Sequence, residues 1–504
     1  MDQSLYKKSR YLFYYEINKK IGAFYNSLNM GVVFGMKEFL EKIIRIKNNL
    51  IKINPASLSS AEKKVIEELK NEGFLLEEKR SEEKRYNEVK KKSITPTELI
   101  AIYLIITENC NFRCRYCAFF AHLPKAYKSQ LMTRETADKA LNLFLKYCSK
   151  NRNKKKSIVL YGGEPLLNIP IFKHIVKRVR SKDFEKKCND NIEIVTFTNG
   201  SLITPDIAKF CSKNKIIPIV SIDGPKEIHD LMRKDINKKN TFEKVLKGYQ
   251  LLKKYGCNVG ISTTIASHNV ENLSLIVKYF KDNLEPINIG LNPLHLITNP
   301  KEEPWAITLE RSAYSMIEAF KTTREVGIYI EQVMRRIRPF VERTPRVKDC
   351  PSCGGLIRFY PSGKYGPCGH FVSMGKNCLS INEEINWRRS KLRKKWNQRS
   401  SFNMGEKCKF CSAISICGGG CPLSAYKRYS DIMGIDDRVC VQSRIFLEWL
   451  IKDLYEIIKP NFKEDALIYI PTKKERSQIY GKINPFNKKL PLQEYSRFGE
   501  IIYD

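Results

Sequence analysis

The sequence lacks both the long apolar runs of membrane proteins and the start of an exported one. No run of about 18 apolar residues occurs in its 504 residues, so we expect no membrane span. The first twenty residues, MDQSLYKKSRYLFYYEINKK, contain no apolar signal core, which predicts a cytoplasmic protein. In that compartment, sixteen cysteines indicate metal or redox sites rather than disulfides.

Acidic residues are scarce relative to basic ones. The chain has 54 Asp and Glu residues against 89 Lys and Arg residues, which gives a formal charge of +35. A charge of this sign and size is typical of proteins that bind nucleic acid, so we consider that class of partner. The excess of basic residues is spread along the whole chain, however, and this favours a general compositional bias over a nucleic-acid site. The densest stretch, Trp387–Trp396, is expected to be a helix with its tryptophans partly buried and a solvated basic face; a ligand-binding face is the alternative.

Three cysteines stand close together after the apolar run Leu99–Ile106. Cys110, Cys114 and Cys117 have the spacing CxxxCxxC. Three thiolates can hold three irons of a [4Fe–4S] cluster, which leaves the fourth iron open to a small molecule. A structural zinc site is the alternative, but zinc usually takes a fourth protein ligand, and His122 is the only close candidate.

The cysteine motif, with Tyr116 just before its last cysteine, resembles that of the radical S-adenosylmethionine (SAM) enzymes. The resemblance implies that the open iron chelates SAM, and that one electron cleaves the sulfonium to give a 5′-deoxyadenosyl radical. A reductant such as flavodoxin or ferredoxin would supply that electron. The same resemblance implies contacts between Tyr116 and the bound cofactors.

Short apolar strands alternate with amphipathic helices from residue 98 to about residue 292, which predicts a parallel sheet with outer helices. The expected strands are Leu99–Ile106, Ile158–Tyr161, Ile192–Thr198, Ile216–Ile222, Val259–Thr264 and Ile287–Leu291. The expected helices are Thr133–Cys148, Ile169–Arg180, Thr204–Lys213, Thr241–Tyr255 and Asn269–Lys281. Six strands in this order match the partial (β/α)6 barrel of the radical SAM family, which we expect over residues 97–320; ligands sit at the carboxyl ends of such strands.

The turn after the second strand, Tyr161-Gly-Gly-Glu-Pro, resembles the family's GGEP motif. Gly162 and Gly163 let the backbone approach a ligand. Glu164 is a candidate acceptor for an ammonium, and the resemblance implies a contact with the amino group of SAM.

The next two strands end in turns that also resemble family motifs. Asn199 lies in a TNG turn and is expected to bind the cofactor, and the resemblance places Ser221 and Arg233 on the ribose and carboxylate of SAM. An arginine fork suits a carboxylate because it binds two oxygens. Asp223 is interpreted as a simple turn residue without a catalytic role, and the backbone of residues 288–292 is expected near the adenine.

A second set of cysteines occupies residues 350–445 and resembles the SPASM domain, with a zinc site as the alternative. The resemblance implies two auxiliary [4Fe–4S] clusters, three clusters in all. Their implied ligands are Cys350, Cys353, Cys368 and Cys421 for cluster I, and Cys408, Cys411, Cys417 and Cys440 for cluster II. Cys350 lies outside the seven-cysteine pattern; without it, cluster I has an open iron. Four of the remaining cysteines are interpreted as buried hydrophobes, namely Cys148, Cys188, Cys211 and Cys257.

Residues 1–96 are expected to form a small α+β unit. Its strands are placed at Tyr11–Ile17, Gly31–Phe34 and Phe74–Leu76, and a helix begins near Ala61. The charged stretch Glu77–Lys92 is interpreted as a solvated linker, so the unit should be separable from the barrel. Loose resemblance to peptide maturases suggests that it binds a leader peptide by strand addition. Residues 321–349 are expected to be a helical bridge, and residues 446–504 a helix and tail without an assigned role.

Enzymes with a SPASM domain mostly modify peptides or proteins. We therefore expect a maturase that abstracts a hydrogen from a residue of a ribosomally made peptide and forms a crosslink, thioether or oxidised product. The alternative within enzymes is an anaerobic sulfatase maturase, but that branch has an Asp after the cysteine equivalent to Cys368, where this chain has Gly369 and His370. His370 is a candidate base, or else a surface histidine. The alternative outside enzymes is an iron–sulfur scaffold or nucleic-acid-binding regulator.

Overall fold

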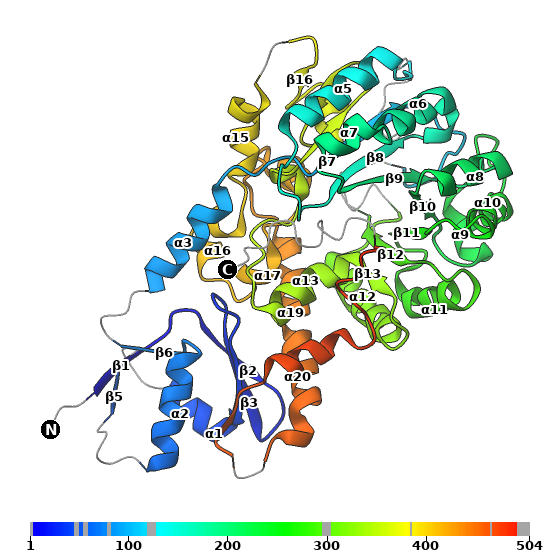
Figure 1. Ribbon diagram of the computed structural model, residues 1–504. Helices are drawn as coiled ribbons and strands as arrows, with labels where there is room; N and C mark the ends of the chain where they lie inside the picture. Colours follow the sequence, from blue (N-terminus) through cyan, green and yellow to red (C-terminus); the bar gives the residue numbers. More distant parts are fainter. Residues whose placement is uncertain are drawn as a thin grey trace.

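A ten-stranded sheet forms the centre of the molecule, with helices covering its outer side (Figure 1). The computed structural model describes residues 4–44, 50–53, 59–77, 82–117, 128–294, 304–383, 386–463 and 466–490. Within these ranges no helix is both long and apolar enough to cross a bilayer. The proposed fourth zinc ligand at residue 122 lies outside the described residues.

Six neighbouring strands of this sheet are parallel and follow one another in chain order. They are β7 (Ala101–Thr107), β8 (Lys156–Gly162), β9 (Ile192–Thr198), β10 (Ile216–Ser221), β11 (Gly260–Ile265) and β12 (Asn288–Pro293). All six predicted strands are confirmed, with ends that agree within two residues. Both faces of the strands are covered, so that in β9 Ile194 packs under the helices and Val195 faces the opposite side. This double burial explains why apolar residues occur on both faces of these strands instead of strictly alternating with polar ones.

The predicted helices between these strands are also confirmed. They are α5 (Arg134–Tyr147), α6 (Ile169–Val179), α8 (Pro205–Lys213), α10 (Phe242–Lys254) and α11 (Leu273–Asn283). Two short helices add to them, α7 (Lys182–Lys187) and α9 (Lys226–Met232). Thr133 and Thr204 cap α5 and α8, because each side chain accepts a hydrogen bond from an amide of the first turn.

The cysteine-rich region extends the same sheet rather than standing apart from it. Its strand β14 (Leu356–Phe359) pairs in parallel with β7, and β15 (Lys364–Gly366) and β16 (Leu379–Ser380) continue antiparallel. At the other edge, β13 (Tyr329–Ile330) pairs with β12 and leads into α13 (Glu331–Glu342). Both tryptophans of the basic stretch are buried, more deeply than the partial burial predicted; Trp387 precedes α15 (Lys391–Asn397) and Trp396 lies within it.

The N-terminal unit contains two small antiparallel sheets. One has the order β5-β1-β6 and consists of β1 (Ser4–Lys8), β5 (Leu50–Ile53) and β6 (Leu75–Glu77). The other has the order β17-β4-β3-β2 and consists of β2 (Leu12–Glu16), β3 (Ile21–Asn26), β4 (Val32–Met36) and, from the far end of the chain, β17 (Ile468–Tyr469). Helices α1 (Lys37–Ile44) and α2 (Ser60–Asn71) complete the unit. The sequence predicted neither β3 nor the contribution of the tail.

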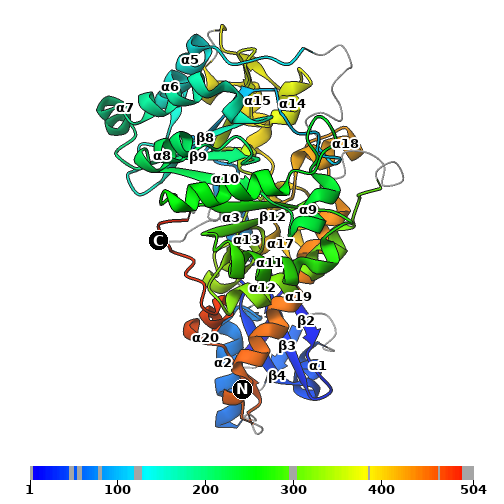
Figure 2. The same cartoon turned by 90° about the vertical axis from the view of Figure 1, so that its right-hand side faces the viewer.

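The expectation of a separable N-terminal unit is wrong. Tyr25 and Phe34 are fully buried in the core that also contains α13 and α19 (Asp437–Ile458), with ring centroids 6.2 Å from Phe340 and 5.6 Å from Tyr455. In both views the unit lies against α19 and the tail (Figures 1 and 2). Buried Arg476 donates hydrogen bonds to carbonyls of the N-terminal unit and of α13, so the two parts share one interior.

The predicted solvated linker is wrong in the part that the structure describes. Residues Glu82–Ile94 form α3, a helix with Tyr86 and Val89 buried. The Tyr86 hydroxyl donates to the carbonyl of Phe402 at 2.8 Å, which fixes α3 on the cysteine-rich region. Tyr86 and Val89 are only two apolar positions, three residues apart, and in so charged a stretch this pattern is too weak to predict a buried helix face.

Candidate active site at the carboxyl ends of the strands

The three-cysteine motif lies in the loop that follows β7, at the carboxyl end of the sheet. The loop is fixed by its backbone, since the amides of Arg113 and Arg115 donate to the carbonyls of Lys234 and Met232 at 2.7 and 2.9 Å. The three cysteine residues are partly exposed. Burial raises the pKa of Cys110 to about 12, and burial also raises that of Cys114 to about 11, against the lowering effect of the Arg233 charge. As free thiols these groups keep their protons, which metal ligation would displace.

Asn199 of the TNG turn holds this loop from the side of β9. Its side-chain amide donates to Asn111 Oδ1 at 2.9 Å and lies 3.9 Å from the sulfur of Cys110. Asn111 in turn donates to Ser201 Oγ at 2.9 Å. Asn199 was predicted to bind the cofactor; its visible contacts position a cysteine.

The GGEP turn packs against the start of the cysteine loop. A Cβ on Gly162 would lie 2.1 Å from the carbonyl oxygen of Thr107, and one on Gly163 would lie 2.2 Å from that of Asn109. Both glycines are therefore required by the close approach of two turns, and Gly162 also has a φ of +149°.

Glu164 is fully buried and joins the ends of β8 and β9. Its carboxylate accepts from the Thr198 hydroxyl and the Asn199 amide, both at 2.7 Å, and from the Leu166 amide at 3.2 Å. Burial raises its pKa to about 7 against the lowering effect of these bonds. Glu164 thus fastens two turns of the site together, and its direct contact with SAM stays a prediction.

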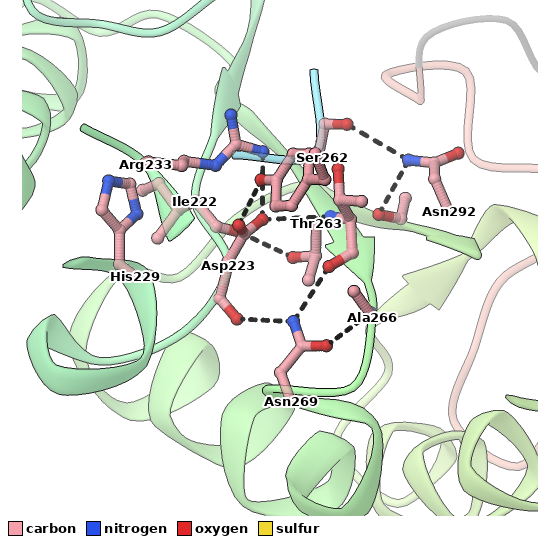
Figure 3. Close-up of polar contacts among 12 residues, drawn as sticks. Ile222, Asp223, His229, Arg233, Ser262, Thr263, Ala266, Asn269 and Asn292 are labelled. Atoms are coloured by element: carbon pink, nitrogen blue, oxygen red, sulfur yellow. Dashed lines mark hydrogen bonds and ion pairs between the residues drawn. The ribbon is translucent and has the colours of Figure 1, made fainter. Parts of the chain in front are cut away.

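Asp223 is the centre of a buried polar network between β10, α9 and β11 (Figure 3). Its Oδ1 accepts from Arg233 Nη2 and from the Thr264 amide, both at 3.0 Å, and its Oδ2 accepts from the Tyr116 hydroxyl. Asn269 donates to the Asp223 carbonyl at 3.2 Å and to that of Thr264 at 2.9 Å. Sequence analysis dismissed Asp223 as a turn residue; its only signal was its position between Ser221 and Arg233.

This network connects two residues that the sequence placed on SAM. The Arg233 guanidinium carbon lies 5.5 Å from the centre of the Tyr116 ring, in cation–π range. Burial works to raise the pKa of Asp223, but the charge and hydrogen bond of Arg233 together with the neighbouring histidines outweigh it and hold that pKa well below its usual range. The Asp223 carboxylate therefore stays ionised and orients both Arg233 and Tyr116.

His268 lies in the turn after β11, on the edge of the same network. Its side chain is 2% exposed, and its Nε2 stands 3.7 Å from Asp223 Oδ2, longer than a hydrogen bond. In the described part of the chain neither ring nitrogen has a hydrogen-bond partner. The next strand contributes Asn292, which donates to Ser262 Oγ at 3.1 Å and accepts from Gln332 at 2.7 Å.

The residues present suit the groups that the motifs imply. Three thiols gather on one loop, and within the described residues the buried Arg233 Nε and both ring nitrogens of His268 make no hydrogen bond. Such orphaned buried donors are uncommon in folded proteins, and a bound ligand would satisfy them. Ser221 lies partly exposed at the end of β10, next to this group.

The cysteines of the second motif gather into two groups of four. Cys350, Cys353, Cys368 and Cys421 all border one small core that includes Phe371 and Trp396. In the other group, burial and then the charges of Cys417, Cys440 and Cys411 raise the pKa of Cys408 to about 12. Among the described residues no three such side chains are close enough to share one metal ion, whereas each cysteine of a [4Fe–4S] cluster binds its own iron.

Two further predictions concern His370 and the cysteines outside the two motifs. His370 is exposed on α14 (Gly369–Ser373), two residues from Cys368, and its role as a base stays a prediction. The four cysteines interpreted as buried hydrophobes are all buried, which confirms that interpretation.

The chain is similar in sequence to known radical SAM proteins. Residues 104–282 match the Radical SAM superfamily. The chain is 24% identical over 422 residues to the radical SAM cyclopropyl synthase TigE of Paramaledivibacter caminithermalis, an alignment that covers 79% of this chain and 85% of TigE. It is 27% identical over 329 residues to a cysteine-type anaerobic sulfatase-maturating enzyme of Clostridium perfringens strain 13, covering 62% and 86% of the two chains.

A solved structure shares the fold. The structure of native anSMEcpe with bound AdoMet and the Cp18Cys peptide superposes with a TM-score of 0.59 at 22% identity, covering 72% of this chain and 99% of that one. The shared part contains a mixed α/β fold with a large, mostly parallel sheet.

Proposed function

We propose, starting from the radical SAM domain that residues 104–282 form, that this chain is a radical SAM maturase of ribosomally made peptides. One observation carries the proposal. The CxxxCxxC loop and the GGEP, TNG and Ser221–Arg233 turns all lie together at the carboxyl ends of the parallel strands. A relative, TigE, is named as a cyclopropyl synthase, and another as a sulfatase-maturating enzyme, so modification of a peptide or protein fits both.

The residues of the loop would hold the catalytic cluster, and the surrounding turns would bind SAM. When bound, these groups supply a radical that removes a hydrogen from an unactivated C–H bond. Cys110, Cys114 and Cys117 would be the iron ligands. Arg233, kept charged and oriented by Asp223, is placed to hold a carboxylate of SAM.

The two groups of four cysteines would hold auxiliary clusters in a SPASM domain. The first group borders the same small core as α15 and is joined to the barrel sheet through β14. Cys350, the ligand outside the seven-cysteine pattern, lies with its three proposed partners. Full ligation of cluster I suits a role in taking an electron from the substrate rather than binding it directly.

The N-terminal unit would bind the leader of the peptide substrate. Among the described residues, β5 and β6 are the outer strands of its three-stranded sheet, and strand addition would take place along one of them. Because the unit shares its interior with α13 and α19, leader binding would act on a part of the enzyme that is continuous with the catalytic domain.

The test is SAM cleavage by the reconstituted enzyme under dithionite, followed by reaction with any short peptide encoded beside its gene as the candidate precursor. We expect 5′-deoxyadenosine from the wild type and none from Cys114→Ala. Cys211→Ala, which changes a buried cysteine of the same domain outside the motif, is the matched control. Full cleavage by Cys114→Ala would contradict the assignment, and modification of a sulfatase peptide instead of the precursor would favour the sulfatase-maturase alternative.

A further inference from the structure

A buried arginine is bonded to the segment that joins the two groups of cysteines. This segment, Gly418–Gly420, follows Cys417, a proposed ligand of cluster II, and precedes Cys421, a proposed ligand of cluster I. Arg399 is only 1% exposed. Its side chain donates hydrogen bonds to the carbonyls of the last two glycines, from Nη2 to the first of them and from Nε to the second, the latter at 3.4 Å. Arg399 is thereby fixed to the shortest chain connection between the two groups.

The backbone of the glycine segment packs tightly against its surroundings. All three glycines have a positive φ, between +68° and +83°. A Cβ on Gly418 would lie 2.4 Å from the amide nitrogen of Asp349, the residue before Cys350. The carbonyls that Arg399 binds therefore belong to a turn that is held against a proposed ligand segment of cluster I.

The hydrogen-bond partners of Arg399 are all neutral. Besides the two glycines, its Nη1 donates to the carbonyls of Ile432 and Gly434, the latter at 3.2 Å. In the part of the chain that the structure describes, no carboxylate pairs with Arg399. Removing an unpaired cation from water is costly, so buried charges in proteins are normally paired with an opposite charge. The carbonyls satisfy the hydrogen bonds of this guanidinium but leave its charge without a partner.

The charge of Arg399 reaches both cysteine groups. Burial raises the pKa of Cys353, a proposed ligand of cluster I, and the positive charge of Arg399 works against that rise. Burial likewise raises the pKa of Cys408, a proposed ligand of cluster II, again against the effect of Arg399. One buried cation thus favours the thiolate form in both groups.

The chemistry of iron–sulfur clusters supplies the missing negative charge. A [4Fe–4S] cluster with four thiolate ligands carries a net negative charge, which grows when the cluster takes up an electron. The reduction potential of a cluster depends on charge, hydrogen bonds and exposure around it. A fixed cation nearby stabilises the more negative, reduced form and therefore raises the reduction potential.

We propose that Arg399 is a positioning residue shared by the two auxiliary clusters, and that its charge raises the reduction potential of both. The inference rests on the proposed function and goes beyond it, because neither cysteine motif includes this residue. A higher potential would make each cluster a better acceptor for an electron that the substrate gives up.

The experiment is a redox titration followed by electron paramagnetic resonance. It uses the reconstituted full-length chain with Cys110, Cys114 and Cys117 changed to alanine, so that only auxiliary clusters contribute to the signal. Arg399→Gln keeps a hydrogen-bond donor but removes the charge. At a potential near the parent midpoint, it should lower the ratio of reduced to oxidised cluster about tenfold for both clusters. For a one-electron couple this is a shift of about 59 mV to lower potential.

Two further variants separate the charge from the hydrogen bonds. Arg399→Lys keeps the charge and loses part of the hydrogen bonding, so both midpoints should stay near those of the parent. Arg476→Gln is the matched control, since Arg476 is also buried and donates to the carbonyls of Met30 and Phe340. It should leave both midpoints unchanged.

The possible outcomes are distinct. Equal midpoints in the parent and Arg399→Gln would overturn the proposal, and so would a shift confined to one cluster. If the glutamine variant loses iron, Arg399→Lys decides: full iron content with unchanged midpoints supports the role of the charge, whereas loss of iron there too would make Arg399 a purely structural residue. A parent chain that holds no iron in either group would instead refute the auxiliary clusters of the proposed function.

Discussion

Replacing Asp223 by alanine is expected to destabilise the protein strongly, even before any cofactor is bound. The carboxylate is fully buried and pairs with Arg233, whose side chain is 9% exposed. Removing one partner of a buried ion pair costs about 3–5 kcal/mol, because the remaining charge is left without compensation. Such a loss is a large share of the 5–15 kcal/mol, roughly, by which proteins are stable.

Two further variants separate the ion pair from general damage. The double variant Asp223→Ala/Arg233→Met removes both charges and should recover much of the loss. Asp230→Ala is the matched control, since this nearby buried carboxylate accepts from the Thr241 and Phe242 amides at the start of α10. As the loss of a helix cap, it should cost about 1 kcal/mol.

The assay is denaturant unfolding of the cluster-free protein under reducing conditions, followed by SAM binding of the reconstituted variants. Asp223→Ala and Arg233→Met should both weaken SAM binding, whereas Asp230→Ala should not. The reasoning is refuted if Asp223→Ala costs no more than Asp230→Ala, or if the double variant is as unstable as the sum of its two single changes.

Three further predictions follow from the structure. Changing Cys110, Cys114 and Cys117 together to alanine should lower the iron content of the reconstituted enzyme from about 12 to about 8 per chain, measured by iron assay; loss of all iron would mean that the cysteine groups are not independent. A chain that starts near Lys92 should fail to fold and to cleave SAM, because it exposes the core that the N-terminal unit covers; soluble, active protein would contradict this. Burial lowers the pKa of His229 to about 4, so the unfolded chain takes up a proton that the folded one resists; stability should fall by up to about 1.4 kcal/mol per pH unit below about 6.5, and His229→Gln should lose that pH dependence.

The barrel strands and their helices could be predicted because each is a local pattern. Ile192–Thr198 is an apolar run that ends in a TNG turn, and its ends in the structure are those expected from the sequence. The cysteine groups were predictable for a similar reason, since spacing alone identifies the motif. Cys350, which lies outside the seven-cysteine pattern, was predicted only by resemblance, and it packs against the same small core as its three proposed partners.

Contacts between distant segments were not predictable. The pairing of β14 with β7 places Leu356 opposite Ala101, and nothing in the sequence of either strand identifies the other as its partner. The role of Asp223 was hidden because a buried carboxylate and a solvated turn residue look alike in a sequence. Only its partners, Arg233 and Tyr116, distinguish the two.

The strand that the tail adds to the N-terminal unit has a consequence for how the chain folds. Ile468 pairs with Gly35, and Arg476 donates a hydrogen bond to the carbonyl of Met30, so the sheet of β2, β3 and β4 is completed by a segment that is made much later. Pairing over so long a stretch is slow, because the loop must close before the contact forms. Until then β4 is an open edge, a template for wrong pairing with another chain. During synthesis this edge of the N-terminal unit therefore stays open until Ile468 and Tyr469 have been made and can pair with β4.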